Sequence, residues 1–236
     1  MMIPLLLSFA GQIAPLSSDV ANPLVRKTVA AMGYVSEGEV VWRNLPDLLR
    51  TQGVYVFQHA GVYGKYSPSA KTVVAATSLL ETKRRGSAAL EPQDVLKGLT
   101  TLFALPPLAE SLIRGPYTDE SETVWYARHS LGGIPSKDHV WIKMNEGVCE
   151  AYLTPTPIRG TPAPPKINLK QLKKILKGVE VKDASVSYRA KSPFDLTPIT
   201  VYSILVRRES GLSDIVEVDA RTGQVFRFPQ APTGQR

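Results

Sequence analysis

Hydrophobic residues recur along this chain in two patterns, one typical of helices and one typical of strands. Three segments carry apolar residues every three or four positions: 23–33, 92–105 and 168–177. Each begins at a residue that favours a helix N-terminus, namely Pro23, Pro92 or Asn168. These patterns predict three helices, each with one apolar face.

The segments between these helices are short, rich in β-branched and aromatic residues, and bounded by Gly, Pro, Asn or Asp. Such runs predict strands. In the run from His139 to Met144, Val140, Ile142 and Met144 point one way and the alternate residues the other. The expected strands lie at 40–42, 54–60, 72–77, 123–128, 139–144, 148–153, 181–190, 199–208, 214–219 and 224–228.

The order of elements suggests a weak internal repeat. A helix followed by antiparallel strands occurs three times, and similar apolar–aromatic segments lie at Val54–Phe57, Val124–Ala127 and Val201–Ile204. This arrangement favours an α+β fold in which helices pack on one side of an antiparallel sheet.

A proline-rich segment divides the chain. Residues 154–165 contain five prolines, which excludes both a helix and a central strand and predicts a semi-rigid connector. The expected organisation is a leader at 1–20, a main part at 21–153, the connector, a helix with antiparallel strands at 166–229, and a tail at 230–236. The part at 166–229 either completes the main sheet or forms a small unit of its own.

The N-terminal residues resemble a secretory signal. Met1–Ala10 is a short apolar run with small residues at plausible cleavage positions, although no basic residue precedes it. We expect an exported protein, periplasmic or extracellular.

The net charge of +7 comes mostly from the second half of the chain, but it is diffuse there and matches no recognised nucleic-acid module, so no nucleic-acid partner is expected. The third helix concentrates positive charge on one face, where an anionic membrane or an acidic partner could bind, although a solvated face is the simpler interpretation. The lysines concerned are Lys170, Lys173, Lys174 and Lys177.

No residue pattern indicates catalysis, a metal site or a cofactor. His59, His129 and His139 lack the spacing of metal ligands, and the single cysteine, Cys149, has no nucleophile context. The expectation is a protein that is not an enzyme, with no catalytic residues, no metal and no cofactor.

The stretch from Gly38 to Val74 resembles periplasmic lipoprotein carriers of the LolA type. A strand and proline corner, a glycine turn and a Tyr-x-Pro turn match that family's pattern, although Ala60 stands where the family has Asp. The matching residues are Gly38, Trp42, Pro46, Arg50, Gly61, Tyr66 and Pro68. Segments 105–111 and 132–139 look similar to a later part of the same family.

The LolA-type resemblance implies a strongly curved, open antiparallel sheet, a half-barrel with helices on its concave side. Between the sheet and the helices would lie a hydrophobic cavity for a lipid or for the acyl chain of a lipidated protein. Aromatic residues of the predicted strands are candidates for its lining, with core packing as the alternative. These candidates are Trp42, Tyr55, Phe57, Trp125 and Trp141.

A second resemblance lies at the other end of the chain. The segment Ile215–Val225, with its Asp-x-x-Thr-Gly turn, looks like the closing hairpin of PepSY-type domains, which are small helix-plus-sheet modules of exported proteins. This resemblance implies an alternative function, in which such modules bind or regulate a protein partner.

Overall fold

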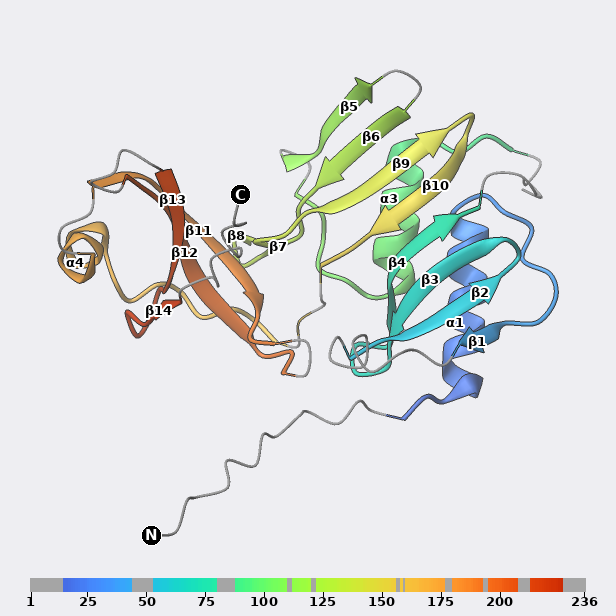
Figure 1. The fold of residues 1–236 in the computed structure, drawn as a ribbon, viewed down its shortest axis with the longest axis horizontal. Coiled ribbons are helices and arrows are strands. Elements are labelled where there is room, and N and C mark those ends of the chain that lie inside the picture. Colours follow the sequence, from blue (N-terminus) through green and yellow to red (C-terminus); the bar gives the residue numbers. More distant parts are fainter. Residues whose placement is uncertain are drawn as a thin grey trace, which may run out of the picture.

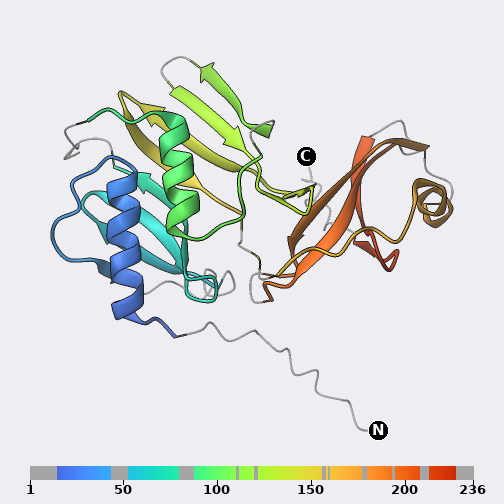
Figure 2. The same cartoon turned by 180° about the vertical axis from the view of Figure 1, so that it is seen from behind.

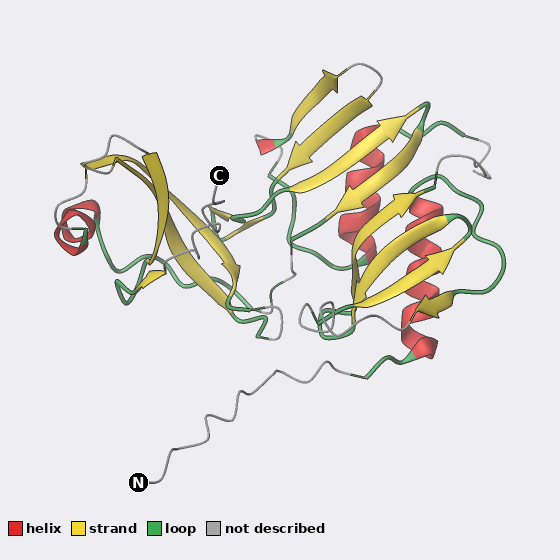
Figure 3. Cartoon of the chain, in the orientation of Figure 1, coloured by secondary structure: helices red, strands yellow, loops and turns green. Residues whose placement is uncertain are grey.

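The computed structural model describes residues 15–43, 53–79, 88–109, 112–119, 122–155, 158, 160–176, 180–192, 195–207 and 213–226. Within these residues the fold is α+β, with three helices and mostly antiparallel sheet that does not close on itself (Figure 3). Residues 1–14 and 227–236, on which the leader and tail predictions fall, lie outside the described residues.

The first unit consists of one helix and four consecutive strands. Helix α1 (Ser18–Ala31) precedes β1 (Val41–Arg43), β2 (Tyr55–His59), β3 (Val62–Ser67) and β4 (Thr72–Ser78). Each strand pairs antiparallel with the next. The predicted corner at Asp47–Arg50 lies outside the described residues.

The second unit repeats this plan with one insertion. Helix α3 (Pro92–Leu102) precedes β5 (Arg114–Asp119), β6 (Glu122–Ala127), β9 (Val140–Asn145) and β10 (Val148–Leu153). The insertion is a small hairpin of β7 (Ser130–Leu131) and β8 (Ile134–Pro135), which lies between the second and third strands of the unit.

The third unit has a sheet of its own. Helix α4 (Leu169–Ile175) precedes β11 (Glu180–Ala190), β12 (Pro198–Arg207), β13 (Ser213–Asp219) and β14 (Val225–Phe226). These strands again pair in sequence order. The segments that suggested a repeat lie in β2, β6 and β12, which are the second strands of the three units, so the repeat is present in the structure.

The first two units share one eight-stranded sheet. Their last strands, β4 and β10, pair antiparallel, with Ala76 opposite Tyr152. The resulting order is β1-β2-β3-β4-β10-β9-β6-β5. Figure 1 looks onto one face of this sheet, and Figure 2 shows α1 and α3 side by side across the other.

The main core lies between these two helices and the sheet. Val25 and Val29 of α1, Leu96 and Leu99 of α3, and Phe57 of β2 are almost fully buried in it. A separate, smaller core joins α4 to the third sheet through residues such as Leu172 and Ile204. The strong curvature and the concave placement of helices implied by the LolA-type resemblance stay predictions.

Three local predictions are wrong. Helix α1 begins at Ser18, so Pro23 lies inside it and costs one backbone hydrogen bond instead of marking its first turn. Helical spacing over 168–177 places Leu169 on the apolar face with Leu172 and Leu176, but the Leu169 side chain is 57% exposed. Strand β5 is missing from the sequence-based prediction because Gly115 and Pro116 interrupt its pattern, where the pairing with β6 shifts register.

Candidate functional site: a cleft between the second and third units

The third unit is attached to the second by the β7–β8 hairpin. Directly after β8, Ser136 forms a parallel bridge with Tyr188 of β11, and the backbone N–H of Lys137 donates to the Tyr188 carbonyl at 2.7 Å. Ser136 and Tyr188 are buried, and burial raises the pKa of the Tyr188 hydroxyl to about 12. The hairpin therefore extends the edge of the third sheet by a short stretch of backbone pairing.

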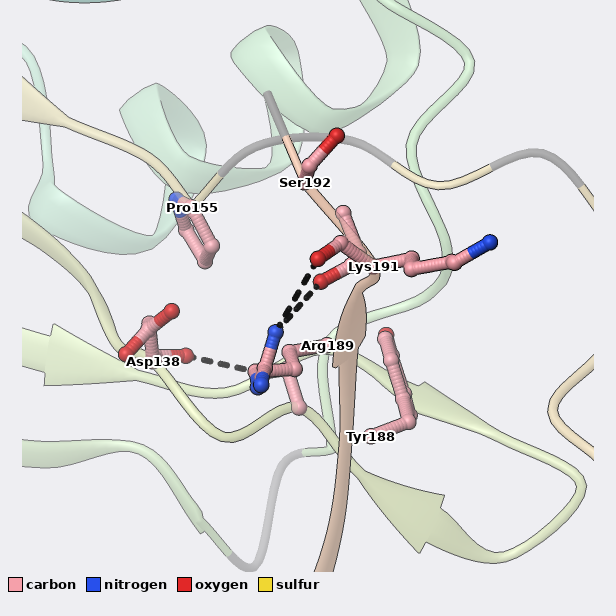
Figure 4. A pocket seen from close by; sticks show the side chains of 8 residues that line it. Asp138, Pro155, Tyr188, Arg189, Lys191 and Ser192 are labelled. Carbon is pink, nitrogen blue, oxygen red and sulfur yellow. Dashed lines mark hydrogen bonds between the residues drawn. The ribbon is translucent and has the colours of Figure 1, made fainter. Parts of the chain in front are cut away.

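A cleft of about 290 Å³ opens beside this junction (Figure 4). Its walls come from the end of β8, the start of the proline-rich connector and the end of β11. The lining residues are Ser136, Asp138, Pro155, Tyr188, Arg189, Ala190, Lys191 and Ser192. The volume is near the lower end of the range for ligand pockets, roughly 300–1,000 Å³, so the cleft suits a few side chains of a partner rather than a large molecule.

Arg189 has a fixed position in the cleft. Its Nη1 donates to the carbonyl oxygens of Ala190, at 3.0 Å, and Lys191, at 3.3 Å, as the dashed lines of Figure 4 show. Its guanidinium carbon lies 5.2 Å from the centroid of the Phe226 ring, within cation–π range. Because these contacts hold its guanidinium group, Arg189 forms part of the cleft wall.

A buried carboxylate links the two units behind this wall. Glu217 of β13 is 1% exposed, and its Oε2 lies 3.3 Å from Arg189 Nε. Its other oxygen forms an ion pair with the ammonium group of Lys137, which belongs to the second unit. A buried carboxylate is costly unless it is paired, so Glu217 favours the arrangement in which Lys137 and Arg189 both reach it.

The outer rim of the cleft is formed by a turn after β11. Lys191 Nζ lies 3.1 Å from Asp195 Oδ2, and the backbone N–H of Asp195 donates to Ser192 Oγ at 2.9 Å. Hydrogen bonds from Thr197 and the charge of Lys191 lower the pKa of Asp195 to about 2. The carboxylate is thus ionised at all physiological pH values and holds Lys191 at the rim.

A buried histidine lies beneath the cleft. His129 lines a small cavity that shares Ser136, Pro155 and Tyr188 with the cleft. The Nδ1 of His129 is 2.7 Å from the Pro106 carbonyl oxygen, so Nδ1 carries the proton and Nε2 is left as an acceptor. Burial lowers the pKa of His129, since the charged imidazolium is poorly solvated there.

The other side chains that could act as a nucleophile, an acid or base, or a metal ligand are buried or hydrogen-bonded within the protein. Cys149 is fully buried, its thiol donates to the Ala151 carbonyl at 3.1 Å, and burial raises its pKa, so it stays protonated. His59 lies between Ser36 and the Glu39 carbonyl. Among the described residues no group of three or more His, Cys, Asp or Glu side chains could hold a metal ion, and no helix there is long and apolar enough to span a membrane.

Comparisons with known proteins show only distant similarity, and it is to solved structures. No family model matches the chain, and no curated protein matches its sequence. Among solved structures, the chain is similar to the C-terminal domain of Bacillus megaterium YpeB, with 14% identity and a TM-score of 0.43. The match covers 91% of this chain and 99% of the YpeB domain. So distant a similarity assigns no function.

Three of the five predicted cavity residues pack against the main core on the helix-covered side of the large sheet. Trp42 is opposite Phe57 in the β1–β2 pair, and their ring centroids are 6.0 Å apart in an edge-to-face arrangement. Phe57 is fully buried, and Trp42 donates to Asn22 Oδ1 of α1 at 2.8 Å. Trp125 packs against the same core from β6. These side chains contact the protein's own core.

The other two residues lie apart from this cluster. Tyr55, half-buried near the start of β2, is on the same side of the sheet as Phe57 and opposite the buried Tyr66, but it is not among the residues that pack against the main core. Trp141 is opposite Tyr126 in the β6–β9 pair and alternates with the buried Val140 and Ile142. Trp141 therefore lies on the face that the helices leave open. The five residues do not form one lining, and a lipid cavity stays a prediction.

The cleft itself was not predicted from the sequence. Its residues come from three separated segments, and nothing in their spacing shows that they meet. The proline-rich connector, which contributes Pro155, was the available signal for a junction between units. Of the predicted lysine face, Lys170, Lys173 and Lys174 are exposed on α4, and Lys177 lies outside the described residues.

Proposed function

We propose that the protein is an exported, non-enzymatic binding protein built of three PepSY-like helix–sheet units. In this proposal it binds a protein partner in the cleft between the second and third units. The observation that carries the proposal is the cleft itself, which combines an apolar wall of Pro155 and Tyr188 with polar groups at its rim. A short segment of a partner could place an apolar side chain against that wall.

The charges at the rim suggest how such a segment would be oriented. Asp138 presents an exposed carboxylate on one side, and Lys191 presents an ammonium group on the other. A bound segment would gain from a basic group beside Asp138 and an acidic group beside Lys191. These rim charges would contribute more to specificity and association rate than to affinity.

Site-specific photocrosslinking in the native cells tests this proposal. A benzoylphenylalanine at position 138 is expected to form an adduct with one protein, whereas the same residue at Lys97, exposed on α3, is not. Lys191→Ala should lower the yield of the adduct. Equal adducts at both positions, or none at position 138 in a folded and correctly localised protein, would contradict the proposal.

The lipid-carrier alternative predicts a different result. Purified protein would then bind a fluorescent fatty acid saturably, and Phe57→Ala would weaken that binding while the fold persists. Under the proposal made above, no saturable binding is expected. Export is tested separately, by sequencing the N-terminus of the mature protein recovered from outside the cytoplasm.

A further inference from the structure

The eight-stranded sheet has one face that none of the helices in the described residues covers, here called the open face. It looks toward the viewer in Figure 1, whereas Figure 2 shows the helices on the opposite face. Directly opposed residues of paired strands point to the same side. The pairs Val56–Arg43, Lys65–Val56 and Leu153–Trp141 therefore place these side chains together on the open face.

An aromatic cluster occupies the part of the open face formed by β5, β6 and β9. Tyr117 is 53% exposed and Tyr126 is 37% exposed, and their ring centroids are 5.7 Å apart. The Tyr126 ring lies 6.1 Å from that of His139, and Trp141 is directly opposite Tyr126. Leu153, 40% exposed on β10, continues the cluster.

The charged side chains described on the open face are mainly basic. One carboxylate is Glu150, which is 4% exposed and lies 3.3 Å from Lys143 Nζ and 2.9 Å from Asn145 Nδ2. The register of β5 and β6 adds Asp119 and Glu122, paired with each other at one corner of the sheet. The cations distributed over the strands are Arg43, Lys65, Arg114, Arg128 and Lys143. With these five cations against three carboxylates, the described part of this face carries a net positive charge around its exposed aromatic groups.

This combination determines what can cover the face. A second copy of the chain would bring like charges together, which is unfavourable. Tyrosine and tryptophan side chains favour the membrane–water boundary, and lysine and arginine are attracted to anionic lipid headgroups. The face is also a broad side of the molecule, because Figure 1 is viewed down the shortest axis. A flat bilayer can approach such a side.

We propose that the open face of the eight-stranded sheet docks on an anionic lipid bilayer, with Tyr117, Tyr126 and Trp141 at the headgroup level and the surrounding cations on lipid phosphates. This peripheral contact is independent of the cleft. It leaves the cleft, which lies at the junction with the third unit, for a different ligand.

Co-sedimentation of the full chain with vesicles tests the proposal. Binding is expected to vesicles of equal parts phosphatidylcholine and phosphatidylglycerol, to fall as salt is added, and to be absent with phosphatidylcholine alone. Arg43→Ala and Arg128→Ala should each lower the partition coefficient about fivefold, and roughly 25-fold together. Ser192→Ala, an uncharged change in the cleft, should not alter it.

A matched control uses the other basic surface of the chain. Lys170→Ala with Lys173→Ala removes the same number of charges from α4 and should change the partition coefficient less than about twofold. If these α4 variants abolish binding and the sheet variants do not, the proposal is wrong and α4 is the membrane contact. Absence of binding to the anionic vesicles by the folded protein also overturns it.

Tryptophan fluorescence gives a second readout that does not depend on charge. Brominated lipids in the anionic vesicles should quench Trp141, whereas Trp42 and Trp125 lie on the helix-covered side. Quenching should therefore be lost in Trp141→Phe, with circular dichroism unchanged. Quenching that persists in this variant would overturn membrane docking by this face. So would Arg43→Ala and Arg128→Ala variants that bind the vesicles normally but no longer bind a protein partner.

Discussion

Replacing Phe57 by alanine distinguishes a packed core from a ligand cavity. The Phe57 side chain is fully buried, its ring meets Trp42 edge-to-face at 6.0 Å, and a β-carbon added to Gly64 would lie only 2.3 Å from the Phe57 ring. Phe→Ala changes at such sites cost about 3–5 kcal/mol in free energy of unfolding. We expect about 4 kcal/mol for this variant, and a fall in Tm on the order of 10 °C.

Urea unfolding followed by far-ultraviolet circular dichroism measures this change. Tyr63→Ala is the matched control, because Tyr63 lies half-buried on the open face of the adjacent strand and contacts Arg43 by a cation–π interaction at 5.3 Å. The control should cost about 1 kcal/mol. A loss below about 1 kcal/mol for Phe57→Ala, with the fold retained, would refute the core interpretation and favour a cavity.

Four further changes test other parts of the structure. Gly64→Ala should destabilise the fold by about 1–3 kcal/mol in urea unfolding, because its methyl group would overlap the Phe57 ring. Because the pKa of His129 is lowered in the folded protein, the unfolded chain binds more protons than the folded one below pH 6.5. The free energy of unfolding should therefore fall as the pH drops below that value, by at most about 1.4 kcal/mol per pH unit. His129→Gln should reduce this slope. Cys149 should react with iodoacetamide at pH 8 in urea but not in the native protein, which mass spectrometry can follow; native labelling would contradict its burial. Glu217→Gln should cost about 1–3 kcal/mol and speed proteolysis of the proline-rich connector, and an unchanged rate would show that this ion pair does not hold the units together.

The local elements of the fold were predictable where their patterns were uninterrupted. Residues 148–153 were expected as a strand and form β10, and Pro92 begins α3 as its position suggested. The β4–β10 pairing was not predictable, since alternation shows which side of a strand is buried but not which strand lies next to it. Strand β5 was missed because Gly115 and Pro116 break the apolar alternation.

The candidate site was harder to predict than the fold. Ser136, Pro155 and Tyr188 meet in space although they belong to a hairpin, a connector and a long edge strand. The sequence-based prediction instead placed the site at aromatic strand residues such as Phe57, which packs into the protein's own core. A sequence pattern reports periodicity within one element, whereas a cleft between two units depends on how the units dock.

The docking of the third unit and the shape of the cleft are linked through Glu217. Lys137 directly precedes Asp138 on one wall, and Arg189 is part of the other, so the carboxylate that pairs with Lys137 and Arg189 fixes the distance between the walls. A ligand that binds only the docked arrangement stabilises it by RT ln(1 + [L]/Kd). By the same linkage, loss of the ion pair must lower the affinity for that ligand by the free energy by which it shifts the docking equilibrium. In the described part of the chain, the second and third units do not share a sheet. The backbone pairing at Tyr188 and the Glu217 ion pair join them instead, and joining by so few contacts allows this coupling.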